Sequence, residues 1–336
     1  MPLVFAEPQI SLSTAHALAA FFTASYVGSL YLSKSARTIY KSDISEDIKP
    51  GEERTKESDE RWRDDPAVVR ARMVAASIST ALSVCVVYWL VRSVTPQTEL
   101  AKVPSTAFRS TLARLGVTTD FAYDNPVYII FPCLVIPVLY LGPLYADWLA
   151  ETLPFQQRWS IQGNLSPLFT TLIGLRNYVV GPITEEIVFR ACMLAVYHMA
   201  GASRTKMIFL TPFFFGFAHL HHAWDTYNRY GRTASAARIA ILSTLFQLTY
   251  TSLFGFHCAY LFLRTGSLLP PTVSHVFCNI MGFPQYSYHV WTFPKRRRLI
   301  QLAYLLGIVG YIYTMRWWTQ ADDSLFWPAP GRVARY

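Results

Sequence analysis

Residues 239–263, IAILSTLFQLTYTSLFGFHCAYLFL, contain no Asp, Glu, Lys or Arg. A helix needs about 20 mostly apolar residues to cross the hydrocarbon core of a bilayer, and it satisfies its backbone polar groups internally. This stretch therefore predicts a membrane-spanning helix. Four further stretches meet the same requirement: residues 12–32, 68–91, 126–145 and 299–318.

Shorter apolar stretches add three candidate spans, which are less regular because they contain prolines or polar residues: residues 183–200, 207–219 and 268–283. Together these eight stretches predict an all-α, polytopic membrane protein with about eight transmembrane helices. Residues 168–180 are also apolar, but they are few and are interrupted by Arg176. We expect them to form a re-entrant or interfacial lead-in to the next span.

The composition excludes an ordinary soluble protein. Of the 336 residues, 52% are hydrophobic and only 15% are charged, whereas an average soluble domain is about 25% charged. Ten of the 21 acidic residues lie between Asp43 and Asp65, which predicts a solvated loop there. The five cysteines lie singly in apolar segments, so neither a disulfide framework nor a thiolate metal site is expected.

The net charge of +9 is better explained by membrane topology than by nucleic-acid binding. The basic residues lie beside apolar runs and do not form a patch interleaved with stacking aromatic residues. Eight spans place the basic loop at 34–63 and the basic run at 295–298 on the same side. Positively charged loops mark the cytosolic side, so we expect both termini on the lumenal side.

Two carboxylates, Glu185 and Glu186, are the only acidic residues within any predicted span, in the stretch GPITEEIVFR at 181–190. An ionisable group inside a span costs several kcal/mol on some scales and indicates function. The i,i+4 spacing lets Glu186 pair with Arg190. Glu185 points about 100° away and is expected to be unpaired, as suits a general base. The alternative is that both glutamates belong to a polar packing network.

Histidine side chains end or interrupt two other apolar stretches. His219 lies in FFFGFAHLHH and shares a helix face with Phe215, while His275 and Asn279 share a face in SHVFCN. Two convergent hydrogen-bond donors suit an oxyanion, although an interhelical polar contact is the alternative. The predicted topology brings these residues and Glu185 to one depth, in a cytosol-facing cavity.

The chemistry that this set predicts is hydrolysis of a peptide or ester. Glu185 and His219 would deprotonate a water, and His275 together with Asn279 would stabilise the oxyanion. No GxSxG elbow supplies a serine nucleophile, and no cofactor is expected. A zinc-dependent version stays open, although the HExxH spacing is absent. A transporter or scaffold is a further alternative, although a transporter often shows an inverted repeat, which we do not find.

Three short motifs carry a resemblance to a known family. Its pattern is EExxxR, FxxxH and HxxxN, which here reads EEIVFR from Glu185, FGFAH from Phe215 and HVFCN from His275. At these residues the chain resembles the eukaryotic type II CAAX prenyl endopeptidases, the Ras-converting enzymes, within the glutamate-dependent intramembrane proteases. The match covers roughly residues 181–284, including the longer strings GPITEEIVFR, GFAHLHHA, LFGFHCAYLFLRTGS and SHVFCNIMGFP.

The resemblance implies removal of the last three residues from farnesylated or geranylgeranylated CaaX proteins, such as Ras-type GTPases or a lipidated pheromone, in the endoplasmic reticulum membrane. It implies that Glu185 and His219 activate water and that His275 and Asn279 form an oxyanion hole. The residues that would support the site structurally are Glu186, Arg190 and Phe215. The prenyl chain would enter from membrane lipid.

We divide the chain on this basis into three parts. Residues 1–165 would form the first three transmembrane helices with the charged loop 34–66. Residues 166–320 would form the catalytic membrane domain, and residues 321–336 a C-terminal tail.

Overall fold

Helices make up the regular structure of the computed structural model, which describes residues 3–41, 51–103, 105–117, 127–319, 324–328 and 336. No β-strand occurs within these ranges, so the all-α prediction is confirmed. The first part of the chain forms α1 (Leu12–Leu32), α2 (Pro66–Val94), α3 (Gln97–Lys102), α4 (Thr106–Arg114), α5 (Val127–Leu139) and α6 (Leu141–Leu149). The last part forms α11 (Arg204–Ala218), α12 (His222–Arg229), α13 (Ala234–Thr265), α14 (Leu269–Met281), α15 (Tyr286–Thr292), a 3₁₀ turn (Pro294–Arg296) and α16 (Arg297–Trp317).

Between these two parts lie short helices that alternate with π-helical segments. A π-helical turn (Ile161–Leu165) precedes α7 (Ser166–Thr170), and a long helical run then continues from residue 172 to residue 199. This run consists of α8 (Leu172–Gly174), a π segment (Leu175–Val180), α9 (Gly181–Glu186), a second π segment (Ile187–Cys192) and α10 (Met193–Met199).

Within the described ranges, four helical stretches are long and apolar enough to cross a membrane: α1, α2, α13 and the stretch Pro294–Trp317. A fifth is formed if α5 and α6 count as one span, although they meet at 69°. The span predicted at 126–145 therefore corresponds, in its described part, to a bent helix pair. Proline disrupts helices because it lacks an N–H donor and clashes with the preceding turn, and α5 contains Pro132 and Pro137. The prediction of about eight spans stays a prediction.

The continuous helical run at 172–199 differs from the sequence interpretation. The expected lead-in and the expected span at 183–200 are one helix, with the last nine residues of the lead-in, 172–180, joined to it without a break. At the junction the Gly181 N–H donates to Arg176 O, five residues back. A Cβ on Gly181 would lie only 2.5 Å from that oxygen. Glycine thus permits the π turn that leads into Pro182.

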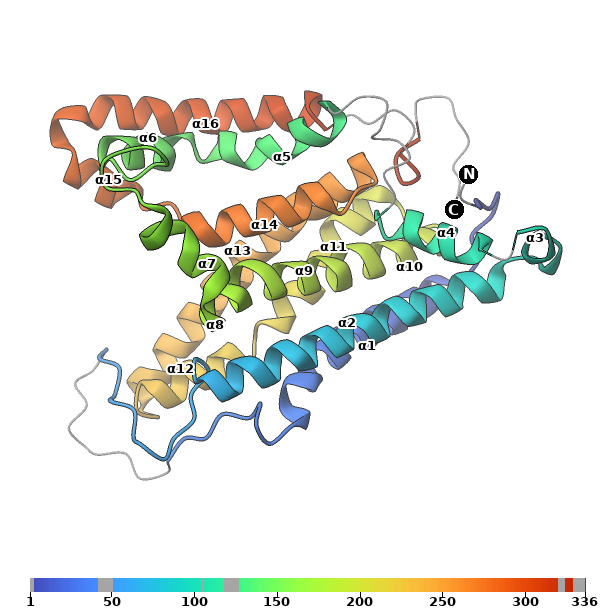
Figure 1. The fold of residues 1–336 in the computed structure, drawn as a ribbon, viewed down its shortest axis with the longest axis horizontal. Helices are drawn as coiled ribbons and strands as arrows, with labels where there is room; N and C mark the ends of the chain where they lie inside the picture. Colours follow the sequence, from blue (N-terminus) through green and yellow to red (C-terminus); the bar gives the residue numbers. More distant parts are fainter. Residues whose placement is uncertain (1–2, 42–50, 104, 118–126, 320–323, 329–335) are drawn as a thin grey trace.

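This central helix is the core of the molecule. All residues from 188 to 199 are buried, and they pack against α1, α2, α11 and α13. Figure 1 shows α9 and α10 between the α1–α2 pair and the layer of α13 and α14. A helix that is apolar on every side belongs in an interior. The carboxylates at the start of this helix are therefore held by the most deeply packed element.

Small residues bring α11 and α13 close together, next to the end of α11 that carries His219. A Cβ on Gly255 would lie 2.5 Å from Pro212 Cβ, and one on Gly216 would lie 2.9 Å from Ser252 Oγ. Small residues allow this kind of close packing in membrane helices. It fixes the C-terminal end of α11 against α13.

The helices have two distinct ends. Figure 1 shows the charged loop, α12 and the start of α16 at one end, and both chain termini at the other. The termini pair through their backbones, with Phe5 N donating to Tyr336 O at 2.8 Å and Tyr336 N to Phe5 O at 3.0 Å. This arrangement agrees with the two-sided division expected from the basic loops.

Candidate active site

The candidate catalytic residues meet in one cavity of about 350 Å³. Glu185, His219, His275 and Asn279 all line it, although they come from α9, the end of α11 and α14. The volume lies within the range of small-molecule sites. The convergence expected from the predicted topology is present in the structure.

Glu186 and Arg190 lie behind this cavity and form the pair that their spacing predicts. Arg190 Nε lies 3.2 Å from Glu186 Oε2, and both side chains are almost fully buried. The guanidinium carbon lies 4.3 Å from the ring centroid of Phe215 and 5.9 Å from that of Phe254. The aromatic faces thus stabilise the part of the buried cation that the carboxylate does not reach.

His275 connects the two glutamates, which sequence reasoning did not predict. Its Nδ1 lies 2.7 Å from Glu186 Oε1, and its Nε2 lies 3.6 Å from Glu185 Oε2. A carboxylate only accepts hydrogen bonds, so Nδ1 carries a proton. The expectation that Glu185 has no partner is therefore wrong, because His275 reaches it from α14, a helix far along the chain.

His219 is held in one tautomer by its own helix. Its Nδ1 lies 2.8 Å from Phe215 O, and because a carbonyl only accepts, this nitrogen is the donor. Nε2 of the neutral ring is then an acceptor. The Phe215 ring also packs edge-on against the imidazole, with the ring centroids 4.7 Å apart. Phe215 supports His219 through both its backbone and its ring.

Asn279 contacts the π-helical segment that precedes the glutamates. Its Nδ2 donates to Asn177 O at 2.8 Å. A carboxamide has two N–H donors, so one is left for a ligand. Sequence reasoning missed Asn177, because a lone asparagine in an apolar run gives no signal of its contact across the cavity.

Other polar groups that the sequence did not single out also line the cavity. The hydroxyl of Tyr26 lies 2.9 Å from Thr184 Oγ1, beside Glu185. Three arginines line it as well: Arg63, Arg72 and Arg176. Arg176 could be noticed in the sequence because it interrupts an otherwise apolar run. Nothing in the sequence places Arg63 and Arg72 at the same site.

Most described residues of the charged loop are exposed, as expected for a solvated loop, but one of its carboxylates is buried. The Glu60 side chain is fully buried and paired with Arg54. Burial would raise the pKa of Glu60, but hydrogen bonds from Arg54 and from the backbone N–H groups of Lys41 and Glu57 lower it to about 2. The buried carboxylate is thus supplied with partners from within its own loop.

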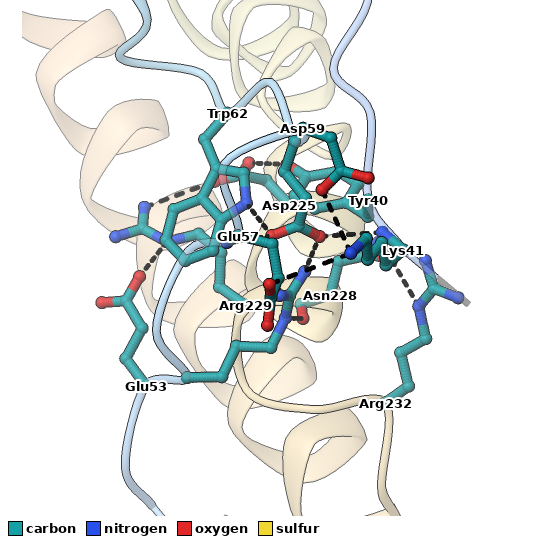
Figure 2. A network of polar contacts seen from close by, with 12 residues as sticks. Tyr40, Lys41, Glu53, Glu57, Asp59, Trp62, Asp225, Asn228, Arg229 and Arg232 are labelled. Carbon is teal, nitrogen blue, oxygen red and sulfur yellow. Dashed lines mark hydrogen bonds and ion pairs between the residues drawn. The ribbon is translucent and has the colours of Figure 1, made fainter. Parts of the chain in front are cut away.

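The same loop is fixed to α12, the helix that follows His219. Arg54 N donates to Arg229 O at 2.9 Å, and Arg54 Nε donates to Asn228 O at 3.0 Å. Figure 2 shows the surrounding network, in which Arg229 bonds to Glu53 and pairs with Asp225. The loop therefore supports the end of the cavity that lies beside α12.

His16 and His257 also lie in apolar helices, but outside the cavity. His16 Nδ1 is 2.6 Å from the Tyr197 hydroxyl. His257 lies between Tyr311 and Ser274, at 3.0 and 3.2 Å. Among the described residues, no group of three or more His, Cys, Asp and Glu side chains is arranged to hold a metal ion.

The fold and the cavity together define a helical membrane protein with a carboxylate–histidine site of the kind that hydrolases use. Comparison with known proteins gives the family. The family described as type II CAAX prenyl endopeptidase, Rce1-like, matches residues 167–281, a range that includes all four candidate catalytic residues. No solved structure matches the chain.

Named relatives match over most of their length. The chain is 31% identical to the probable CAAX prenyl protease 2 of Schizosaccharomyces pombe, over 88% of this chain and 90% of that protein. It is 33% identical to human CAAX prenyl protease 2, over 91% of this chain and 80% of the relative. The chain belongs to the type II CAAX prenyl endopeptidase family, as the resemblance predicts, and is therefore a peptide hydrolase. These relatives give no support to the transporter or scaffold alternative.

Proposed function

We propose that this enzyme removes the aaX tripeptide from proteins whose CaaX cysteine carries a farnesyl or geranylgeranyl chain. The observation that carries the proposal is the convergence of Glu185, His219, His275 and Asn279 in one cavity, within a family named for this substrate class. We further propose that the reaction uses a water activated by side chains and needs no metal.

Glu185 and His219 are the groups suited to activate the water. His219 presents Nε2 as an acceptor because Phe215 O holds its Nδ1 proton, and Glu185 is the carboxylate at the cavity wall. The water would give one proton to Glu185 while its oxygen bonds to the scissile carbonyl carbon. The C–N bond then breaks, and the proton passes to the amine of the departing tripeptide.

His275 and Asn279 are the groups suited to hold the oxyanion. The Asn279 carboxamide has one N–H that Asn177 does not use. His275 would donate through Nε2, which requires protons on both ring nitrogens. Glu186 accepts from Nδ1 and so stabilises the positive ring while Nε2 donates. This role for Glu186 acts through His275 and not on the substrate.

The lipid chain of the substrate has an apolar wall available. Val27 and Leu30 of α1 and Val69 and Met73 of α2 are apolar residues that line the cavity. An isoprenoid partitions into apolar surroundings, so we place it against this wall, with the peptide on the polar side. Arg63 of the basic loop lines the cavity, which supports a site that faces the cytosol. The endoplasmic reticulum membrane is proposed from the family resemblance alone.

The substrate class can be tested with two peptides of the same CaaX sequence, one farnesylated and one not. Membranes containing the enzyme should release the intact aaX tripeptide, identified by mass spectrometry, from the farnesylated peptide. The unmodified peptide should react at least about tenfold more slowly, because it lacks the apolar contacts. Membranes without the enzyme are the control. Equal cleavage of both peptides, or release of a fragment of another length, would contradict the proposal.

A further inference from the structure

The cavity has an excess of positive charge that the proposed chemistry does not use. Among the described residues that line it, Glu185 is the only carboxylate, whereas three arginines are present. Arg63 comes from the charged loop, Arg72 from α2 and Arg176 from the π segment before α9. These three side chains come together from distant parts of the chain.

The arginines differ in how far their charge is already neutralised. Arg176 Nη1 lies 2.7 Å from Asp64 Oδ1, so this cation has an anionic partner. Arg72 Nε donates to Ala36 O at 2.9 Å, which is neutral. Arg63 Nη1 lies 3.3 Å from His222 Nδ1. Neither Arg63 nor Arg72 forms an ion pair with a carboxylate in the part of the chain that the structure describes.

The acidic residue of α12 near Arg63 is also committed elsewhere. Asp225 accepts from the hydroxyl of Tyr40 and pairs with Arg229, whose Nη1 lies 3.5 Å from Oδ2. Burial and the neighbouring charges of Arg176 and Arg72 lower the pKa of Arg63, and Asp64 and Asp225 offset only part of this effect. An anion that enters the cavity beside Arg63 would relieve this crowding of positive charge.

We propose that Arg63, assisted by Arg72, binds the α-carboxylate that ends the aaX segment of the substrate. This assignment rests on the proposed function, because that reaction brings a free peptide C-terminus into the cavity. A guanidinium matches a carboxylate with two parallel hydrogen bonds. Binding the C-terminus at a fixed place would determine which peptide bond reaches the catalytic groups.

The spacing is compatible with release of three residues. Arg63 contacts His222, and the ring centroids of His222 and His219 are 5.7 Å apart. One imidazole therefore separates Arg63 from the proposed water-activating histidine. Three extended residues span at most about 11 Å. If Arg63 holds the terminal carboxylate, the third peptide bond counted from the C-terminus is thus within reach of His219.

The test uses two farnesylated peptides that differ only at the C-terminus, which is a free acid in one and a carboxamide in the other. The full-length enzyme in membranes is compared with Arg63→Gln, Arg63→Lys and, as a matched control, Arg70→Gln. Arg70 is an exposed residue of α2 outside the cavity. The readout is the ratio of kcat/KM for the acid to kcat/KM for the amide.

We expect kcat/KM of the wild-type enzyme to be at least about tenfold higher for the free acid than for the amide. A hydrogen-bonded pair of charged groups contributes enough binding energy for such a preference. Arg63→Gln should raise KM for the acid and bring the ratio near one, with cleavage of the amide little changed. Arg63→Lys should keep part of the preference, and Arg70→Gln all of it.

Three results would overturn the assignment. One is a wild-type enzyme that does not distinguish the two peptides, and another is an equal loss on both peptides in Arg63→Gln, which would make the arginine structural. If the wild-type enzyme cleaves neither peptide, the proposed function fails and the assignment fails with it. Cleavage of both peptides at the same rate leaves the proposed function standing, so the two failures are distinguishable.

Discussion

His275 Nδ1 lies 2.7 Å from Glu186 Oε1, and the same carboxylate lies 3.2 Å from Arg190 Nε through its other oxygen. Glu186 is therefore shared between a buried cation and a histidine at the cavity wall. A purely structural partner of Arg190 would not need the second contact. The arrangement links the stability of the central helix to the orientation of His275.

The first prediction separates these two roles of Glu186. Arg190→Gln should lower stability by about 3–5 kcal/mol, because it leaves Glu186 as a buried charge without its cation. Adding Glu186→Gln should restore much of that stability, but activity should stay low because His275 loses its carboxylate. The measurements are thermal unfolding in detergent and tripeptide release per folded enzyme. Full activity of the stable double variant would contradict a role for Glu186 through His275.

The second prediction concerns the ring of Phe215. Phe215→Leu should destabilise the protein by about 2 kcal/mol, because Arg190 loses the aromatic face above its guanidinium. The backbone carbonyl that holds His219 remains and only the edge-on ring contact is lost, so kcat of the folded fraction should fall by less than about tenfold. Phe217→Leu is the matched control, since Phe217 is 53% exposed on the same helix. An equal loss of stability in both variants would show that the cation contact is not the cause.

The third prediction uses the pH dependence of the charged loop. The pKa of Glu60 is lowered from its ordinary value of 4.5 to about 2. A lowered pKa contributes stability that is fully present above the ordinary value and is lost as the pH falls toward the folded value. Protection of the loop from proteolysis should therefore decrease between pH 4.5 and 2. In Glu60→Gln it should be low at every pH.

Glu57→Gln is the control for this measurement, because the Glu57 side chain is largely exposed and its carboxylate lies 3.8 Å from Lys41. It should retain the wild-type profile. An acid-acting protease keeps the assay usable at low pH. Protection of Glu60→Gln that matches the wild type at neutral pH would contradict the buried ion pair as the anchor of the loop.

The fourth prediction tests the π turn that leads to the glutamates. Gly181→Ala places a Cβ only 2.5 Å from Arg176 O, so the turn must shift and Glu185 with it. We expect kcat to fall at least about tenfold, as a small misplacement of a catalytic group suffices for this. Gly28→Ala in α1 is the control, because a Cβ there meets nothing within 4 Å. Unchanged kcat in Gly181→Ala would show that the turn does not position the site.

Local spacing predicted the parts of the site that lie within one helix. The pairing of Glu186 with Arg190 and the shared face of Phe215 and His219 follow from i,i+4 geometry. The predicted topology also placed the candidate catalytic residues of three helices at the same depth in the membrane. The sequence could not show the contact between Glu186 and His275, because it depends on how helices far apart in the chain pack.

The remaining differences have similar causes. A continuous helix at 172–199 was hidden because its π turns disturb the apolar period on which sequence interpretation depends. The burial of Glu60 in an otherwise exposed charged loop could not be predicted, because its partners depend on how the loop folds. Arg63 has no sequence signal at all for the cavity. Arg63 reaches the cavity because the loop packs beside α12.

The most direct test of the central claim compares tripeptide release from a farnesylated CaaX peptide by the wild-type enzyme, by Glu185→Gln and by the wild type with a zinc chelator. Glu7→Gln, at an exposed carboxylate away from the cavity, is the matched control. We predict at least about a hundredfold loss in Glu185→Gln, with Glu7→Gln and the chelated enzyme fully active. Normal activity of well-folded Glu185→Gln, or loss with chelator and recovery with zinc, would contradict metal-free activation of water by Glu185.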